Sequence, residues 1–227
     1  MKYIYSYNSY NGKRLPTPFE KKLALLSVVS LHEATGEEIT FYGDIDTVQF
    51  VLDNKIPFDN IYSHRFEHNY SAYWNTGKLE IYAMQNTPFL HVDFDTVFFT
   101  GFSVPEADIV TEKKRNFIDT PEIRKFAIRE YKNPTELICS GLLGGNWTNA
   151  FYELNENLFR NRAKLQNETP EFDELISLEE YALSQIAEQY KLRVAELDKR
   201  FFAHWQGANK EQRFGKIIND LCEMYGI

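Results

Sequence analysis

The chain has little cysteine, with only Cys139 and Cys222 among 227 residues. The two residues lie far apart, and neither stands in a C-x-x-C or other zinc-type spacing. A disulfide framework is therefore not expected, and both residues are interpreted as buried thiols. A reducing cytoplasm is the expected location, with peripheral contact at a membrane left open.

Positive charge is also scarce, because 25 Lys and Arg residues face 33 Asp and Glu residues, a formal net charge of -8. Nucleic-acid phosphates are bound by clustered Lys and Arg side chains, so this balance argues against a nucleic-acid partner. An acidic chain that handles phosphates needs local cations or a metal ion.

Long apolar runs are missing as well. The first residues, "MKYIYSYNSYNGKR", become polar within ten positions, and no run approaches the roughly 18 apolar residues of a membrane span. No transmembrane segment, internal repeat or linker is expected. With 43% hydrophobic residues the chain can bury a sizeable core, and one domain over 1–227 is the simplest prediction.

Short apolar strands alternate with helical patterns along this chain. Strands are predicted at 2–7, 38–43, 58–63, 107–112 and 192–197, and helices at 18–35, 46–55, 75–86, 147–165, 176–191 and 210–225. The first helix has a capping box of Thr17 and Glu20 and ends at Gly36, with apolar positions at Leu23, Leu25, Leu26, Val29 and Leu31. Such alternation predicts a mostly parallel sheet, from which 113–135 departs as an excursion.

The stretch "FLHVDFDTVFF", residues 89–99, is an apolar run interrupted by Asp93 and Asp95. Two carboxylates at i and i+2 share one face of a strand and repel each other unless a cation lies beside them. Mg²⁺ or Mn²⁺ relieves this repulsion. The alternative is a turn after a buried strand, with both acids in solvent.

Near the other end lies "HWQGANK", residues 204–210. Imidazole is a good ligand for Mn²⁺-like ions, glycine allows close approach of a diphosphate, and a lysine ammonium neutralises phosphate charge. Taken singly, His204, Gly207 and Lys210 have ordinary explanations as a partly buried histidine, a turn residue and a solvated helix start.

Together these motifs resemble the GT-A fold nucleotide-sugar glycosyltransferases, particularly retaining family 8, which includes glycogenin and the lipopolysaccharide galactosyltransferases. The resemblance implies a Rossmann-like, mostly parallel central sheet flanked by helices, with a nucleotide-binding half at 1–112 and an acceptor half at 113–227. It implies a Mn²⁺ (or Mg²⁺) ion held by Asp93, Asp95 and His204, and a diphosphate at Gly207 and Lys210.

The resemblance also assigns residues at the donor sugar. "GKLEIYAMQNTPFLHVDFD" assigns a sugar contact to Lys78, whose alternative is an ordinary surface lysine, and Phe94 is placed with the donor. "CSGLLGGN" is similar to the family's N-[SA]-G-[VL] stretch and assigns Ser140 and Gly141 to the pocket, although Cys139 replaces the usual asparagine.

Two further stretches complete the assignment. "YSYNSY" is similar to the strand and loop that hold the base, with Tyr7 or Tyr10 stacking on uracil and Asn8 hydrogen-bonding it. "SLEEYALSQI" assigns the catalytic role to Glu179 or Glu180, with an acid where the family has glutamine. The alternatives are core or surface tyrosines and a solvated helix face.

The implied reaction is transfer of a sugar from a UDP-sugar to an acceptor hydroxyl with retention of configuration. The acceptor is open among a saccharide, a lipid-linked glycan and a protein. Two other functions remain: a haloacid-dehalogenase-type phosphatase, because "DFDTV" also satisfies D-x-D-x-[TV], and a catalytically inactive sugar-nucleotide-binding protein.

Overall fold

A computed structural model describes residues 1–227 except 11, 13, 68–75, 116–135, 166–171 and 206–208. The chain divides into two compact units. The first unit comprises Met1–Glu67, His91–Val104 and Asp198–Ile227, and the second comprises His68–Leu90 and Pro105–Leu197. One domain over 1–227, with halves meeting at residue 112, stays a prediction.

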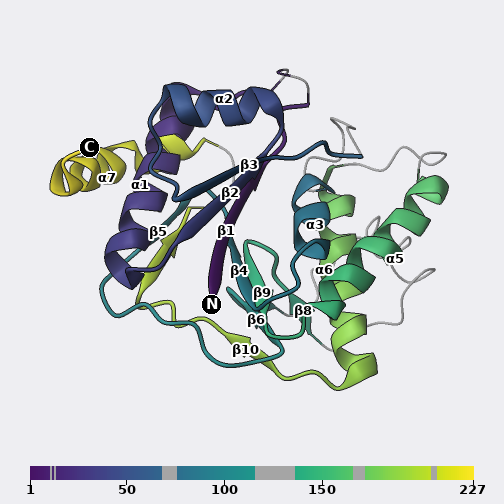
Figure 1. Cartoon of the computed structure of the whole chain (residues 1–227). Coiled ribbons are helices and arrows are strands. Elements are labelled where there is room, and N and C mark those ends of the chain that lie inside the picture. Colours follow the sequence, from purple (N-terminus) through teal and green to yellow (C-terminus); the bar gives the residue numbers. More distant parts are fainter. Residues whose placement is uncertain (11, 13, 68–75, 116–135, 166–171, 206–208) are drawn as a thin grey trace. The chain divides into compact units, whose positions relative to one another are not determined.

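The first unit contains a parallel sheet (Figure 1). Its strands β1 (Lys2–Tyr7), β2 (Ile39–Gly43) and β3 (Asn60–Ser63) run parallel in the order β1-β2-β3, and the second half of β4 (Phe89–Val92) lies beside β1. Helix α2 (Ile45–Asp53) packs on β2 and β3. The predicted mostly parallel sheet is confirmed here.

Helix α1 (Pro18–Thr35) begins and ends as its sequence predicts. The Thr17 side chain accepts a hydrogen bond from the Glu20 N–H, the Glu20 carboxylate accepts one from the Thr17 N–H, and Gly36 closes the helix with a left-handed φ of 69°. The prediction of its apolar face was wrong at two positions, because Leu25 and Val29 are only half-buried.

The buried face of α1 instead includes two serines that bind neighbouring strands. Ser27 Oγ shares a 2.8 Å hydrogen bond with the Tyr5 hydroxyl on β1, and Ser30 Oγ accepts a 3.1 Å bond from Phe98 N on β5 (Thr96–Phe98). These bonds satisfy polar groups that burial would otherwise penalise. They hold α1 against both strands.

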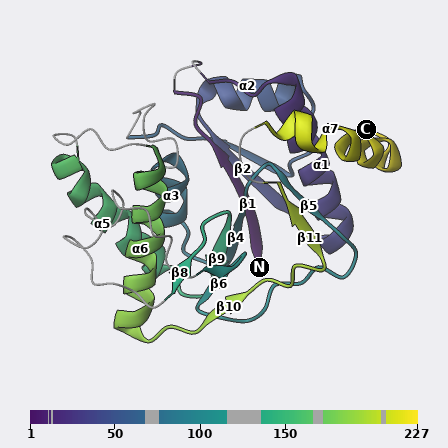
Figure 2. The same ribbon diagram turned by 180° about the vertical axis from the view of Figure 1, so that it is seen from behind.

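A short antiparallel pair, absent from the sequence prediction, completes the first unit. Strand β11 (Phe202–His204) pairs with β5, and Figure 2 shows the two side by side. After β11, helix α7 (Lys210–Tyr225) packs on α1. The core between them is formed by Leu23, Leu26, Val97, Trp205, Ile218 and Cys222.

The second unit has its own helices and strands. Helices α3 (Thr76–Ala83), α5 (Asn149–Leu165) and α6 (Phe172–Tyr190) pack in sequence, α3 on α5 and α5 on α6. Its described strands are β6 (Ile109–Thr111), β7 (Lys114–Arg115), β8 (Leu137–Ile138), β9 (Leu142–Gly145) and β10 (Val194–Glu196), together with the first half of β4. The order is β10-β6-β9-β4, with β10 parallel and β9 antiparallel to β6, while β7 and β8 form a separate pair.

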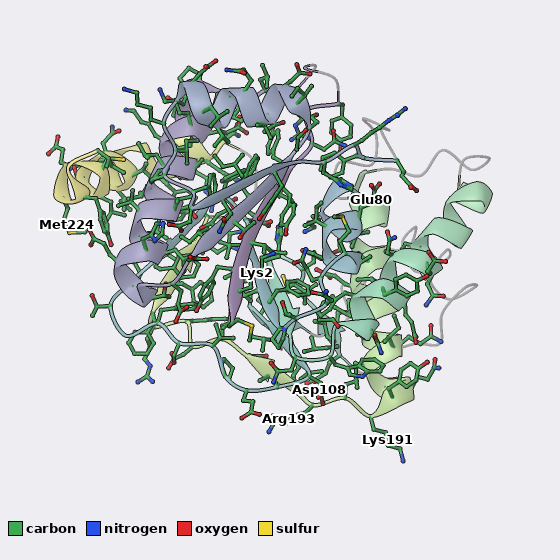
Figure 3. The ribbon with its side chains drawn as sticks, in the orientation of Figure 1. Lys2, Glu80, Asp108, Lys191, Arg193 and Met224 are labelled. Carbon is green, nitrogen blue, oxygen red and sulfur yellow. The ribbon has the colours of Figure 1, made fainter. Side chains whose placement is uncertain are left out.

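Polar contacts fix the turn from α6 into β10. Asp108 accepts a 2.8 Å hydrogen bond from the Arg193 N–H, and Figure 3 shows these two residues next to each other. Both cysteines are buried thiols, as predicted. In the described part of the chain, no helix has the length and apolar character needed to cross a membrane. Most of the predicted excursion at 113–135 lies outside the described residues.

Gly144 lets β9 approach β4 closely. A Cβ at this position would lie 1.9 Å from the Phe89 carbonyl oxygen and 2.7 Å from the Leu90 Cα, both backbone atoms that cannot rotate away. Gly215 in α7 is the opposite case, because its Cβ would meet only the Glu211 Cγ at 3.8 Å.

We therefore expect Gly144→Ala to destabilise the protein by about 3 kcal/mol or more, the upper end of overpacking penalties. The matched control Gly215→Ala is expected to stabilise it by up to about 1 kcal/mol through helix propensity. Urea denaturation of both variants measures the difference. Equal stability of the two would contradict the close approach of β9 to β4.

Candidate metal and sugar-nucleotide site

Asp93 and Asp95 lie in the turn between β4 and β5. Strand β4 ends at Val92, the Thr96 N–H donates a 3.2 Å hydrogen bond to the Asp93 carbonyl, and β5 begins at Thr96. The acids therefore do not share a strand face, as the sequence suggested, but a tight turn brings them together. Neither acid is fully solvated, since their side chains are 25% and 13% exposed.

Strand β11 brings His204 to these acids. His204 pairs with Thr96 in the β5–β11 register, and the Trp205 N–H donates a 3.0 Å bond to the Asp95 carbonyl. The His204 Nε2 atom lies 3.1 Å from Asp95 Oδ1 and 4.0 Å from Asp93 Oδ2, with the imidazole 3% exposed. One ligand atom from each of the three residues lies within 4.8 Å of the others.

Lys210 is the first residue of α7 and completes this group of charges. Its Nζ donates a hydrogen bond to Asp95 Oδ2. Burial alone would raise the pKa of Asp95, but the hydrogen bond and charge of His204 and the ammonium of Lys210 lower it to about 2. Asp95 is thus ionised at neutral pH. Gly207 lies outside the described residues.

This donor set suits a divalent ion. Two carboxylates and one imidazole, largely withdrawn from water, match the ligand preferences of Mn²⁺ and similar ions. A cation there would offset the repulsion between Asp93 and Asp95, which Lys210 already offsets in part. The predicted ligands Asp93, Asp95 and His204 can therefore hold a metal ion together.

Phe94 anchors the turn that carries the two acids. Its ring packs in an aromatic cluster, with centroids 5.3 Å from Tyr5 and 6.0 Å from both Tyr7 and Phe41. The structure thus gives Phe94 and Tyr7 a packing contact with each other. Their predicted contacts with a nucleotide sugar stay predictions.

The loop after β1 contains the predicted base-binding residue Asn8. Its Oδ1 accepts a 2.9 Å bond from the Tyr10 N–H, and Tyr10 has a φ of 56°. Among the described residues, no group hydrogen-bonds the buried Asn8 Nδ2. An unsatisfied buried donor is costly, and the predicted hydrogen bond from Asn8 to a base stays a prediction.

Asp44, which the sequence interpretation missed, braces this loop. Its Oδ2 accepts 2.7 Å bonds from both the N–H and the Oγ of Ser9, and its Oδ1 caps α2 through the Thr47 N–H at 2.9 Å. The sequence signal was available, because an aspartate directly before a helix is a typical N-cap.

In the second unit, three predicted sugar-site residues lie together. The Lys78 ammonium donates to the carbonyl of Ser140 at 3.1 Å and lies 4.0 Å from the Glu179 carboxylate. Lys78 and Glu179 are both buried, so neither the surface-lysine nor the solvated-helix alternative is correct. Glu180 and Gly141 are also buried.

Cys139 stands where the glycosyltransferases that the sequence resembles have asparagine, and it has an acidic neighbour that the sequence interpretation did not single out. Its thiol lies 3.9 Å from Glu112 Oε2, and both side chains are buried. A thiol is a weak hydrogen-bond donor, so this position differs chemically from an amide. Glu112 directly follows β6, and this position at the end of a strand was the only sequence feature that could have identified it.

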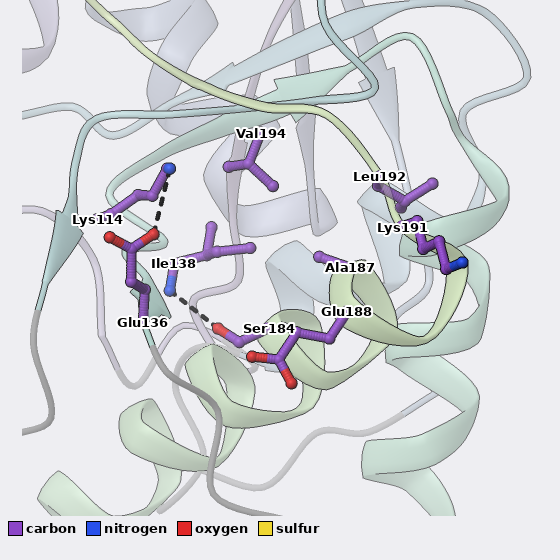
Figure 4. A pocket seen from close by; sticks show the side chains of 9 residues that line it. All are labelled: Lys114, Glu136, Ile138, Ser184, Ala187, Glu188, Lys191, Leu192 and Val194. Carbon is purple, nitrogen blue, oxygen red and sulfur yellow. Dashed lines mark hydrogen bonds and ion pairs between the residues drawn. The ribbon is translucent and has the colours of Figure 1, made fainter.

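A hollow of about 330 Å³ also lies in the second unit (Figure 4). Lys114 and Glu136, 3.2 Å apart, line one side, and Glu188 and Lys191 line another. Ser184 Oγ accepts a 3.0 Å bond from Ile138 N across its floor. None of the predicted site residues lines this hollow.

Comparison with known proteins supports the fold. No protein-family model and no curated protein sequence matches the chain. Among solved structures, it is similar to mouse xyloside xylosyltransferase 1 in its apo form, with a TM-score of 0.51 and 11% identity over 97% of this chain and 92% of that one. This likeness confirms the predicted α/β fold of the GT-A type.

The Lys78–Glu179 contact can be tested by a double-mutant cycle. Removing one member of a buried ion pair leaves the other charge uncompensated, which costs about 3–5 kcal/mol. We expect Lys78→Met and Glu179→Gln each to be strongly destabilising, and the double variant to be less destabilised than the sum of the two. Additive losses in urea denaturation would show that the two side chains do not interact.

Proposed function

We propose that this protein is a metal-dependent glycosyltransferase that transfers a sugar from a UDP-sugar to an acceptor hydroxyl. The observation that carries the proposal is the convergence of Asp93, Asp95, His204 and Lys210 in the first unit. The fold shared with a xylosyltransferase supports it. Membership of retaining family 8 is part of the proposal.

The charges in the first unit suit a diphosphate leaving group. Asp93, Asp95 and His204 would hold Mn²⁺, which supplies Lewis-acid stabilisation of the departing diphosphate. Lys210 places an ammonium at the N-terminus of α7, where backbone N–H groups and the helix dipole also favour an anion. These groups stabilise the negative charge that develops as the glycosidic bond breaks.

We assign the other predicted site residues to roles in binding the UDP-sugar and in catalysis. Asn8 Nδ2, which has no hydrogen-bond partner among the described residues, is proposed to hydrogen-bond the base, and Tyr7 is proposed to stack on it. In the second unit, the buried Lys78, Ser140 and Gly141 are proposed to contact the donor sugar, and Glu179 or Glu180 to stabilise the reacting carbon. The acceptor is proposed to be a saccharide, a lipid-linked glycan or a protein, and the location the cytoplasm.

A phosphatase of the haloacid-dehalogenase type fits these observations less well. In that mechanism the second acid of D-x-D must give up a proton, but the pKa of Asp95 is lowered to about 2 and its carboxylate is paired with His204 and Lys210. An inactive sugar-nucleotide-binding protein is favoured by two departures from the family's pattern, the thiol of Cys139 in place of asparagine and the acid Glu180 in place of glutamine.

Hydrolysis of a panel of UDP-sugars tests the proposal, because transferases can pass the sugar slowly to water. We expect Mn²⁺-dependent release of UDP from at least one donor. Asp95→Ala and His204→Ala should lower it on the order of 100-fold or more, since both remove a metal ligand. Asp220→Ala, which removes an exposed carboxylate on α7, is the matched control and should be unchanged.

Three results would count against the proposal. Hydrolysis that survives in Asp95→Ala would show that the metal site is misassigned. Release of phosphate from simple phosphomonoesters, without use of UDP-sugars, would favour the phosphatase. Thermal stabilisation by UDP and Mn²⁺ without hydrolysis or transfer would favour the inactive binding protein.

The proposed role of Lys210 in diphosphate binding can be tested separately from the role of the metal ligands. In Lys210→Met we expect UDP to bind about 10- to 100-fold more weakly, because a charge-assisted contact to the diphosphate is lost. Mn²⁺ alone should bind at least as tightly as in the parent, since the ammonium no longer pairs with Asp95. Calorimetric titration measures both affinities, with Lys216→Met, an exposed lysine on the same helix, as control. Parallel loss of both affinities would contradict this division of roles.

A further inference from the structure

Strand β4 carries a histidine among apolar residues. In "FLHV" all four residues are buried, and the His91 imidazole is 1% exposed. A buried imidazole needs hydrogen-bond partners, because its transfer from water is otherwise costly. One partner is on β1, where Ser6 Oγ lies 2.9 Å from His91 Nε2.

The other ring nitrogen of His91 faces the candidate metal site. His91 Nδ1 lies 3.7 Å from Asp93 Oδ1, while Asp93 Oδ2 lies 4.0 Å from His204 Nε2. The Asp93 carboxylate thus has an imidazole near each of its two oxygens. Asp93 is also the more exposed of the two acids, so its orientation is less constrained by packing than that of Asp95.

We infer that His91 is a positioning residue that orients the Asp93 carboxylate for metal binding. In this arrangement the ring proton is on Nδ1, directed towards the carboxylate of Asp93, and Nε2 accepts a hydrogen bond from the Ser6 hydroxyl, a direction with which the 2.9 Å Ser6–His91 contact is compatible. Oδ2 is then turned towards His204 and the metal. This inference rests on the proposed function, because it assigns Asp93 as a ligand.

The contact between His91 Nδ1 and Asp93 Oδ1 is 3.7 Å long, so it is electrostatic and longer than a hydrogen bond, and its proposed effect is that of residues placed behind a metal ligand. Such residues fix the orientation of the ligand, and their loss typically costs 10- to 100-fold in metal affinity. Here Ser6, His91 and Asp93 form a chain from β1 through β4 to the turn, all within the first unit. The site is therefore held by the sheet as well as by β11.

Two substitutions of His91 test the roles of its ring nitrogens Nδ1 and Nε2 one at a time. The short amide introduced by His91→Asn can replace Nδ1 towards Asp93 but does not reach Ser6. The longer amide introduced by His91→Gln can replace Nε2 towards Ser6 and removes the N–H that faces Asp93. We expect Mn²⁺ binding in the presence of UDP to be about 10- to 100-fold weaker in His91→Gln and within a few-fold of the parent in His91→Asn. Electron paramagnetic resonance of free Mn²⁺ measures the affinity without requiring turnover.

A merely structural role predicts the reverse order. Glutamine is closer to histidine in volume and keeps the contact with β1, so His91→Gln should then bind Mn²⁺ better than His91→Asn. Equal affinities of the two variants, or tighter binding by His91→Gln, would overturn the inference. If the parent itself binds no Mn²⁺, the proposed function fails and the inference with it.

Ser6→Ala provides a second measurement if either histidine variant fails to fold. It leaves His91 in place but removes the hydroxyl that selects the ring tautomer. We expect a several-fold loss of Mn²⁺ affinity with an unchanged affinity for UDP alone. Parental Mn²⁺ affinity in Ser6→Ala would overturn the inference.

Discussion

The antiparallel pairing of β5 with β11 brings His204 next to Asp95, although the two residues lie far apart in the sequence. Backbone hydrogen bonds on both sides of the register, from Phe99 N to the Phe201 carbonyl and from Trp205 N to the Asp95 carbonyl, hold the two segments together. Val97 and Trp205 then bury their side chains in a core with α1 and α7. Apolar packing thus stabilises an arrangement of polar side chains that would not assemble by themselves.

Charge balance is the second constraint on this site. Two carboxylates within a few ångströms repel each other, and burial of Asp95 makes the repulsion more costly. His204 and Lys210 offset it from β11 and from the first turn of α7, so the same elements that build the core also supply the compensating charge. A bound divalent ion would complete the balance, and a diphosphate would then give Lys210 a second anionic partner.

The sequence predicted the elements with strong local signals. These signals are the caps of α1, the extent of α7 and the spacing within each of the two motifs, all of which depend on residues close together in the sequence. The structure confirms the two helices and brings Asp93, Asp95, His204 and Lys210 together. Strands β5 and β11 were not predicted, because their stability comes from pairing with each other and from tertiary packing, which no local pattern reports. The same holds for the burial of Lys78 and Glu179 and for the role of His91, which resembles an ordinary core residue until its neighbours on β1 and in the turn are known.

A crystal structure with Mn²⁺ and UDP is the most direct test of the central claim, that Asp93, Asp95 and His204 form one metal site. Anomalous scattering locates Mn²⁺ independently of the protein. The account predicts one anomalous peak within bonding distance of all three side chains, with the diphosphate on its open side next to Lys210. A Mn²⁺ ion bound elsewhere, with these three residues uncoordinated and Asp95 still paired with Lys210, would contradict it.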